Sequence, residues 1–255
     1  MTQTDLSRAT ADYAIRLGDD ALIHGHRLSE WCSRGPFLEE DLALTNVALD
    51  FIGRARMFLG YAAQLLDGDC SEDSLAYQRD CRQFTNLLIH ELPRGDFAFT
   101  MARQYLLDEH AVLFLDALQG STDTELAAIA GKAIKESHYH LRRSREWMLR
   151  LGDGTQESQQ RLQRALEELW GYVPELFAMD ALERELLAVG IAVDREILVA
   201  PWRSAVERTF AQTAISLPGD DWRVEGGRGG YHTEHLGHLL SELQFLQRAY
   251  PGCQW

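Results

Sequence analysis

Proline occupies only six of the 255 positions of this chain, and this scarcity constrains its fold more than any other feature. A proline inside a helix removes a backbone hydrogen bond and clashes with the preceding turn. Between the few prolines, apolar residues recur every three or four positions, which is the period of an amphipathic helix. The sequence therefore predicts an almost entirely α-helical protein.

Glycine- and proline-containing breaks divide the chain into four long helices followed by shorter ones. A capping-box pattern, Thr122 with Glu125, marks the start of the fourth long helix. Long helices joined by short connections favour an up-and-down four-helix bundle with additional C-terminal helices, and no linker divides residues 1–255, so we expect a single domain. The long helices are expected at about 11–32, 39–66 (stopping at Asp67-Gly68), 96–118 and 122–151, and the shorter ones at about 75–89, 158–176, 182–189, 194–215 and 233–249.

The charge balance restricts the partners of the chain. Acidic residues outnumber basic ones by 39 to 25, which gives a net charge of −14. Binding to nucleic acid or to an anionic membrane surface needs clustered Lys and Arg, so neither partner is expected. The four cysteines have no CxxC spacing, and the sequence contains neither a signal-peptide stretch nor an apolar run long enough to span a bilayer. We therefore expect a cytoplasmic protein.

Acidic residues and histidines lie on apolar stripes of the expected helices. Glu136 and His140 share a face with Leu126, Ile129, Ala133 and Trp147. On the second helix Asp50 belongs to a stripe with Asn46, Gly53, Met57 and Tyr61, beside Leu42, Leu49 and Ile52, which we expect on or near an inward face. A buried carboxylate is costly unless it is paired, hydrogen-bonded or bound to metal, so these positions are candidates for a site.

Two further helices carry similar groups. Asp108, Glu109 and His110 follow one another on the third long helix, and at most two of them are expected to point inward, because adjacent helical residues diverge by about 100°. Asp20 and His24 lie one turn apart on the first helix.

A di-iron carboxylate bundle takes a Glu-x-x-His motif from each of two helices. In this chain the corresponding positions carry Asp50 with Gly53, and Glu136 with Tyr139, while His140 is displaced by one residue. Both anchoring imidazoles are therefore missing. The pattern indicates a degenerate di-iron site, and we expect no metal, cofactor-binding or catalytic residue in this chain.

The C-terminal part contains a second group of histidines. His232, His235 and His238 surround Thr233 and Glu234. A metal site is one interpretation, but we favour Thr233 as a helix N-cap, Glu234 against the positive helix end, and histidines packed on the preceding loop. That loop has four glycines within residues 226–230, and we expect it to become ordered only on binding, because glycine raises the entropy cost of ordering.

Several segments together carry a family resemblance that covers almost the whole chain from about residue 13. The chain resembles the family of the C component of the bacterial phenylacetyl-CoA 1,2-epoxidase, a multicomponent oxygenase of phenylacetate breakdown. The segments are YAIRLGDDALIHGHRLSEW, EEDLALTNVALDFIGRARMFLGYAA, RQFTNLL, FTMARQYLLDEHAVLF, AIAGKAIKESHYHLRRSREWMLRLGDG, LWGYVPELF, GIAVD and YHTEHLGHLLSELQFLQR.

The resemblance implies an all-α, ferritin-like fold and a non-catalytic structural subunit. It further implies that the chain docks on and stabilises a partner subunit that holds the di-iron centre and epoxidises the ring of phenylacetyl-CoA. A homodimer of the isolated chain is the other assembly left open. The alternative function is a self-sufficient ferritin-like metalloenzyme that uses Asp50, Glu109, His110, Glu136 and His140 in an unusual arrangement, and a third hypothesis is a helical scaffold unrelated to oxygenation.

Overall fold

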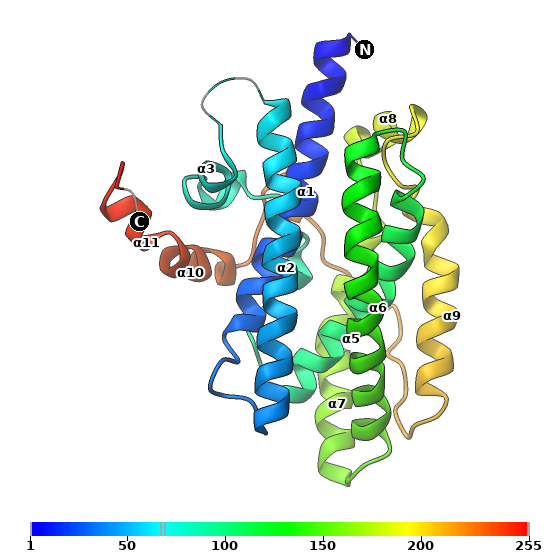
Figure 1. The fold of residues 1–255 in the computed structure, drawn as a ribbon. Helices are drawn as coiled ribbons and strands as arrows, with labels where there is room; N and C mark the ends of the chain where they lie inside the picture. Colours follow the sequence, from blue (N-terminus) through cyan, green and yellow to red (C-terminus); the bar gives the residue numbers. More distant parts are fainter. Residues whose placement is uncertain (1, 67, 69, 254–255) are drawn as a thin grey trace. The chain divides into compact units, whose positions relative to one another are not determined.

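The computed structural model describes residues 2–66, 68 and 70–253, and every regular element within this part is a helix (Figure 1). The all-α prediction is confirmed. The α-helices are α1 (Gln3–Ser29), α2 (Leu38–Leu65), α3 (Glu72–Tyr77), α4 (Leu88–Glu91), α5 (Phe97–Leu118), α6 (Thr124–Gly152), α7 (Gln156–Leu169), α8 (Ala181–Ala188), α9 (Val199–Phe210), α10 (Glu234–Leu243) and α11 (Phe245–Ala249), and the 3₁₀ helices are η1 (Cys81–Gln83), η2 (Trp170–Leu176), η3 (Glu196–Leu198) and η4 (Gly227–Gly229).

The four predicted long helices are present, with differences at their ends. Helix α1 begins well before the expected residue 11, because the side chains of Thr2 and Asp5 form a capping box. Asp123, rather than Thr122, caps α6, and its carboxylate accepts from the backbone of Glu125 and Leu126. Helix α2 ends at Leu65, and Asp67 of the expected stop signal lies outside the described residues.

The prediction of one helix over residues 75–89 is wrong. The segment instead forms α3, η1 and α4, because its polar groups are bound to buried carboxylates of α1 rather than to one another. Arg79 pairs with Asp19, whose side chain is fully buried, and the Thr85 backbone donates to the same carboxylate at 2.9 Å. The Leu87 backbone donates to Asp20 at 2.8 Å.

Three shorter helices also differ from the predictions. The expected helix at 158–176 turns into the 3₁₀ helix η2, which contains Pro174. The expected helix at 194–215 begins as η3 and ends at Phe210. The last helix is interrupted at Gln244, whose side-chain amide donates to the carbonyl groups of Ala76 and Arg79.

The chain divides into two compact units, each assembled from segments that are distant in sequence. Unit 1 consists of Met1–Glu30, Leu44–Pro93 and Gly226–Trp255, and unit 2 consists of Trp31–Ala43 and Arg94–Glu225. The single-domain organisation of residues 1–255 stays a prediction.

In unit 1, helices α1 and α2 run side by side (Figure 1), and two glycines of α1 permit the close approach. A Cβ atom at Gly18 would come within 2.7 Å of the Leu59 side chain, and one at Gly25 would lie 3.1 Å from the backbone oxygen of Ala48. The absence of side chains at these two positions lets α2 pack directly against the backbone of α1.

In unit 2, α5 is the central helix and contacts α6, α7 and α9. All ten residues from Met101 to His110 are buried. The indole of Trp202 on α9 donates to the carbonyl group of Leu106 at 3.0 Å, which fixes α9 against α5. Because neighbouring helices surround this stretch, its polar side chains are buried together with its apolar ones.

The glycine-rich segment 226–230 packs closely within unit 1. A Cβ at Gly227 would overlap the carbonyl oxygen of Asn86, and one at Gly230, where φ is +75°, would overlap that of Arg82. Arg228 pairs with Asp20 at 2.7 Å and donates to the carbonyl oxygen of Thr85 at 2.6 Å. These contacts contradict the expectation that the loop is ordered only on binding.

Within the described part of the chain, no helix is both long and apolar enough to cross a membrane.

We predict that Gly227→Ala lowers the free energy of unfolding by about 1–3 kcal/mol, because the added methyl group must displace backbone. The matched control is Gly237→Ala on α10, where a Cβ meets no atom within 4 Å. This control is expected to stabilise by up to about 1 kcal/mol through helix propensity. Thermal unfolding of both variants checks the prediction, and equal stability of the two would contradict it.

Candidate functional site

The expected inward stripe of α2 is not its buried face. Asn46 and Gly53 are exposed, and Asp50 is half-buried. The buried face instead carries Leu44, Val47, Ala48, Phe51, Arg54, Ala55, Phe58, Leu59 and Ala62, because this is the side that packs on the glycines of α1. The carboxylate of Asp50, at one of the degenerate di-iron positions, therefore lies at the edge of the buried face rather than at its centre.

The prediction for α6 is partly confirmed. His140 is buried, together with Ala133 on the same face, and Glu136 is half-buried. Tyr139, at the position where a di-iron site has an imidazole, is 49% exposed and lies against the guanidinium of Arg142. Its ring therefore lies on the side of α6 that faces solvent.

The three consecutive polar residues of α5 are all buried. Helices α6, α7 and α9 contact this helix, so side chains that point in different directions are all enclosed. Asp108 accepts hydrogen bonds from Gln104 and Ser144, both at 2.7 Å. The His110 ring stacks on Phe114 and meets Phe177 edge-on, with centroid separations of 5.7 and 5.4 Å.

Glu109 lies in an environment that disfavours its charged form. Burial raises the pKa of this carboxyl group, and the nearby Tyr105 hydroxyl and Arg145 guanidinium offset this effect only in part. Burial, followed by the charge of Glu109, also raises the pKa of Tyr105. Arg145 is itself held by a 3.0 Å hydrogen bond to Thr209. A metal ligand must be deprotonated, and burial opposes that charge on Glu109.

The donor set does not fit a di-iron centre. Glycine at position 53 has no donor atom, and the phenol of Tyr139 is half exposed. Within residues 2–66, 68 and 70–253, no three His, Cys, Asp or Glu side chains are placed to hold a metal ion together. No catalytic step through iron is therefore derived for this chain.

A second fully bound acidic group of unit 1 is Glu91, which no sequence pattern marked as a candidate. Its side chain is fully buried. It accepts from His232 Nδ1 at 2.7 Å, from the Thr233 backbone at 2.6 Å and from Asn86 at 2.9 Å. Because the carbonyl oxygen of Phe84 can only accept, His232 Nε2 donates to it at 2.8 Å. Both ring nitrogens thus face acceptors, which favours the imidazolium form.

Two residues of the C-terminal group occupy their predicted positions. Thr233 is the N-cap of α10 and Glu234 lies in its first turn, although the Thr233 hydroxyl makes no capping hydrogen bond. The side chain of His232 is bound to Glu91 and to the backbone of Phe84. On α1, Asp20 pairs with Arg228, and His24 packs edge-on against Phe51 and His90, with centroid separations of 4.7 and 5.3 Å.

Comparison with known proteins identifies the family. Residues 1–255 match the family described as Phenylacetic acid catabolic protein. The chain belongs to this family. It is 49% identical over 243 residues to the C component of the 1,2-phenylacetyl-CoA epoxidase of Escherichia coli (strain K12), one of the subunits of that enzyme, and the match covers 95% of this chain and 98% of the relative. Members of the Phenylacetic acid catabolic protein family have an all-α, ferritin-like fold, so the resemblance and the fold class are both confirmed.

We predict a pH-dependent contribution of His232 to stability. Burial opposes its charge, but the hydrogen bonds to Glu91 and Phe84 and the Glu91 charge outweigh this effect and raise the pKa of His232. A raised folded-state pKa means that the stabilisation is complete below the unfolded value of about 6.5 and is lost as pH rises through the folded value.

The measurement compares urea unfolding of the wild type and His232→Gln at several pH values. The wild type is expected to exceed the variant by about 1.5–3 kcal/mol in unfolding free energy near pH 6, and by less as the pH rises. His238→Gln, at an exposed histidine, serves as the control and should not change the pH profile. A difference that grows between pH 6 and 9 would refute the assignment.

Proposed function

We propose that this chain is a non-catalytic structural subunit of a multicomponent di-iron monooxygenase that epoxidises the aromatic ring of phenylacetyl-CoA. In this proposal it docks on the catalytic subunit and stabilises it, and iron, oxygen and substrate are handled by that partner. The cytoplasm is the expected compartment.

The observation that carries the proposal is the similarity to one component of a larger enzyme. A relative that is 49% identical over almost its full length is named as a subunit of an epoxidase, which implies further subunits in that enzyme. Similarity of this extent supports the same kind of assembly for this chain.

The residues at the expected metal-ligand positions favour a structural role over a catalytic one. A metal site of the two-histidine kind needs imidazole nitrogen atoms at positions 53 and 139, and these positions hold an exposed glycine and a half-exposed tyrosine. Two buried acidic groups are instead engaged in structural bonds, as Glu91 is with His232 and Asp108 is with Ser144.

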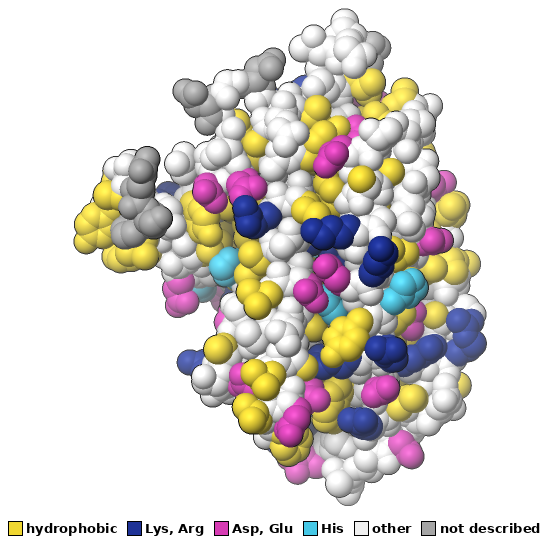
Figure 2. All heavy atoms as spheres, viewed as in Figure 1, with side chains coloured by type: hydrophobic (Ala, Val, Ile, Leu, Met, Phe, Trp, Pro, Cys, Tyr) yellow, Lys and Arg dark blue, Asp and Glu magenta, His cyan; other side chains and the backbone are white. Residues whose placement is uncertain are grey.

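The beginning of α2 offers an apolar surface for docking. Leu38 and Leu42 are 71% and 56% exposed, and their spacing of four residues places them on one side of the helix. Phe37, which precedes them, is 62% exposed. Figure 2 shows apolar and acidic side chains interspersed along this part of α2. Exposed apolar groups that cluster beside polar ones mark protein interfaces, and we assign this surface to the catalytic subunit.

Metal content and enzymatic activity test the proposed role. The chain purified alone is expected to lack stoichiometric iron and to be inactive, and after co-expression with a catalytic di-iron subunit it is expected to form a stable complex that epoxidises phenylacetyl-CoA. Asp50→Asn with Glu136→Gln should retain this activity. Metal analysis, size-exclusion chromatography and turnover assays test these statements. Stoichiometric iron with oxygen-dependent turnover in the isolated chain would establish the alternative metalloenzyme.

Substitutions at the beginning of α2 test the assignment of the docking surface. Leu38→Glu with Leu42→Glu should weaken the complex by about tenfold or more, because two apolar contacts worth more than about 1.4 kcal/mol in total are lost. Ile197→Glu, at a residue that is 66% exposed and lies in η3, is the matched control. Titration of the two subunits by calorimetry gives both affinities. Equal affinities of variant and control would exclude this surface.

A further inference from the structure

The two lysines of this chain, Lys132 and Lys135, both lie on α6 of unit 2. Arg142 follows them on the same helix, and all three residues are exposed. Positions 132, 135, 139 and 142 are separated by three, four and three residues, which places them on one side of a helix. Lys132, Lys135, Tyr139 and Arg142 are called the basic stripe below. The stripe extends about 15 Å along the helix, and Figure 2 shows basic side chains and a histidine together over the middle of α6.

Neighbouring acidic groups do not compensate the charges of the basic stripe. In the described part of the chain, its three cations take part in no ion pair. Glu136 lies one turn after Lys132 but is half-buried. Glu146 lies one turn after Arg142 but pairs with Arg150 at 3.6 Å. The stripe therefore presents its positive charges to solvent, although the net charge of the chain is −14.

Other arginines of unit 2 are paired, as is usual on exposed helices that carry both signs of charge. Arg161 on α7 binds Glu157 at 2.6 Å, and Arg143 on α6 pairs with Glu40. The basic stripe departs from this pattern. Charges that are paired within a chain have little attraction left for a partner, whereas a stripe of one sign attracts a surface of the opposite sign.

Tyr139 adds a contact surface to these charges. It is 49% exposed, and the guanidinium carbon of Arg142 lies 5.6 Å from the centre of its ring. Tyrosine and arginine are enriched among the residues that dominate protein interfaces. Tyrosine buries a large area at low entropy cost, and the arginine fork can bind a carboxylate through two hydrogen bonds. The stripe thus offers both charge and contact area to a carboxylate-bearing partner.

The chemistry of the stripe favours an acidic protein segment over nucleic acid. A nucleic acid carries negative charge along its whole length, and the net charge of −14 repels it. A short acidic segment needs to meet only the stripe itself. The spacings of three, four and three residues are also those of the seam along which two helices pack side by side. An acidic helix with carboxylates at the same spacings would therefore match the stripe.

The stripe differs in kind from the surface assigned to the catalytic subunit. The centres of protein interfaces are depleted of charged residues, and the docking surface at Leu38 and Leu42 is accordingly apolar. Complementary charges instead raise the association rate and select the partner. The basic stripe therefore suits a further partner that binds and dissociates.

The aromatic pocket of unit 2, of about 330 Å³, offers less to a ligand. It lies between η2, α9 and the irregular segment that follows α9, and Trp170, Trp202 and Trp222 belong to its lining. Trp170 and Trp202 are only 2% and 1% exposed. Their indole N–H groups donate to Asp220 and to the carbonyl group of Leu106. These two rings are part of the packed core of the unit.

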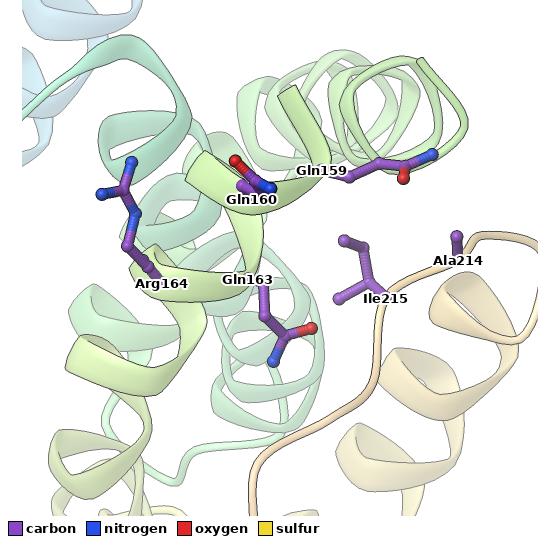
Figure 3. A pocket seen from close by; sticks show the side chains of 6 residues that line it. All are labelled: Gln159, Gln160, Gln163, Arg164, Ala214 and Ile215. Atoms are coloured by element: carbon purple, nitrogen blue, oxygen red, sulfur yellow. The ribbon is translucent and has the colours of Figure 1, made fainter. Parts of the chain in front are cut away.

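A second pocket, of about 370 Å³, lies between α7 and the chain at Ala214 and Ile215 (Figure 3). Its Gln163 amide already bonds to the backbone of Ser216 in both directions, at 3.0 and 3.1 Å. Figure 3 shows the side chain of Arg164 directed away from Ile215. The charged group of this pocket is therefore not aimed at its interior, and the basic stripe is the more specific feature of unit 2.

We propose that the basic stripe of α6 binds an acidic helix of a protein partner, with carboxylates of that helix at the two lysines and at Arg142 and with its side chains packed on Tyr139. The inference goes beyond the proposed function, because it concerns a further partner and a different surface. Binding is measured without the catalytic subunit, so the failure of one proposal is distinguishable from the failure of the other.

The test is titration of the full chain with an acidic model helix, followed by fluorescence anisotropy. The probe is a stapled, alanine-rich peptide with glutamates at spacings of three and four residues along one face. At an ionic strength of about 0.1 M, where the screening length of about 10 Å isolates the stripe from distant charges, we expect a Kd of about 1 mM or lower. Added salt should weaken the binding. The same peptide with glutamine in place of glutamate should not bind, and a DNA duplex of equal charge should bind at least about threefold more weakly.

Variants connect the binding to the stripe. Replacing Lys132, Lys135 and Arg142 together by glutamine should weaken the binding of the acidic peptide at least about tenfold. Tyr139→Ala should weaken it about threefold without changing its salt dependence, because contact area is lost but no charge. The charge-matched control replaces three exposed arginines of unit 2 outside α6 by glutamine: Arg34, Arg164 and Arg223.

The control is expected to bind the acidic peptide within about threefold of the wild type, because distant charges are screened. Absence of binding to the wild type at millimolar concentration, or equal affinities of the stripe variant and the control, would overturn the proposal. Tighter binding of the duplex than of the peptide would also overturn it and assign the stripe to nucleic acid.

Discussion

The burial of the Glu91 carboxylate is the constraint on which the organisation of unit 1 depends. A carboxylate without access to water is tolerated only when its oxygens accept enough hydrogen bonds, and the bonds to Glu91 come from residue 86 and from residues 232 and 233. Arg27 of α1 adds a second connection, because it donates to the backbone carbonyl groups of both Glu91 and His235. The C-terminal segment is therefore part of the core of this unit, because it supplies the His232 and Thr233 donors to the buried carboxylate.

The same requirement explains why α3, η1 and α4 replace one continuous helix. Asp19 and Asp20 are adjacent on α1, and each accepts from both a backbone N–H and an arginine. The backbone is extended at Phe84 and Leu87, so the N–H groups of Thr85 and Leu87 can donate to these carboxylates instead of to a helical carbonyl group. The charges of Asp19 and Asp20 thus determine the local structure of this unit.

Much of the fold was predictable from the sequence, but the faces of the helices were less so. Long helices follow from periodicity and from glycine and proline breaks, which are local signals. The prediction of the inward face of α2 was wrong because Leu42 and Leu49 have the spacing of core residues yet are exposed. Periodicity identifies an apolar face of a helix but not the element that covers it. The break near residue 80 was missed because its cause, Asp19, lies about sixty positions earlier and its pairing is a tertiary interaction.

The candidate site shows the same division between local and tertiary information. The absence of histidine at positions 53 and 139 could be read directly from the spacing, and it argues against a two-histidine metal site wherever those helices lie. The aromatic pocket could not be read in this way, because Trp170, Trp202 and Trp222 come from η2, α9 and an irregular segment with no shared motif. The residues that line a pocket are brought together by tertiary packing, which local periodicity does not reveal.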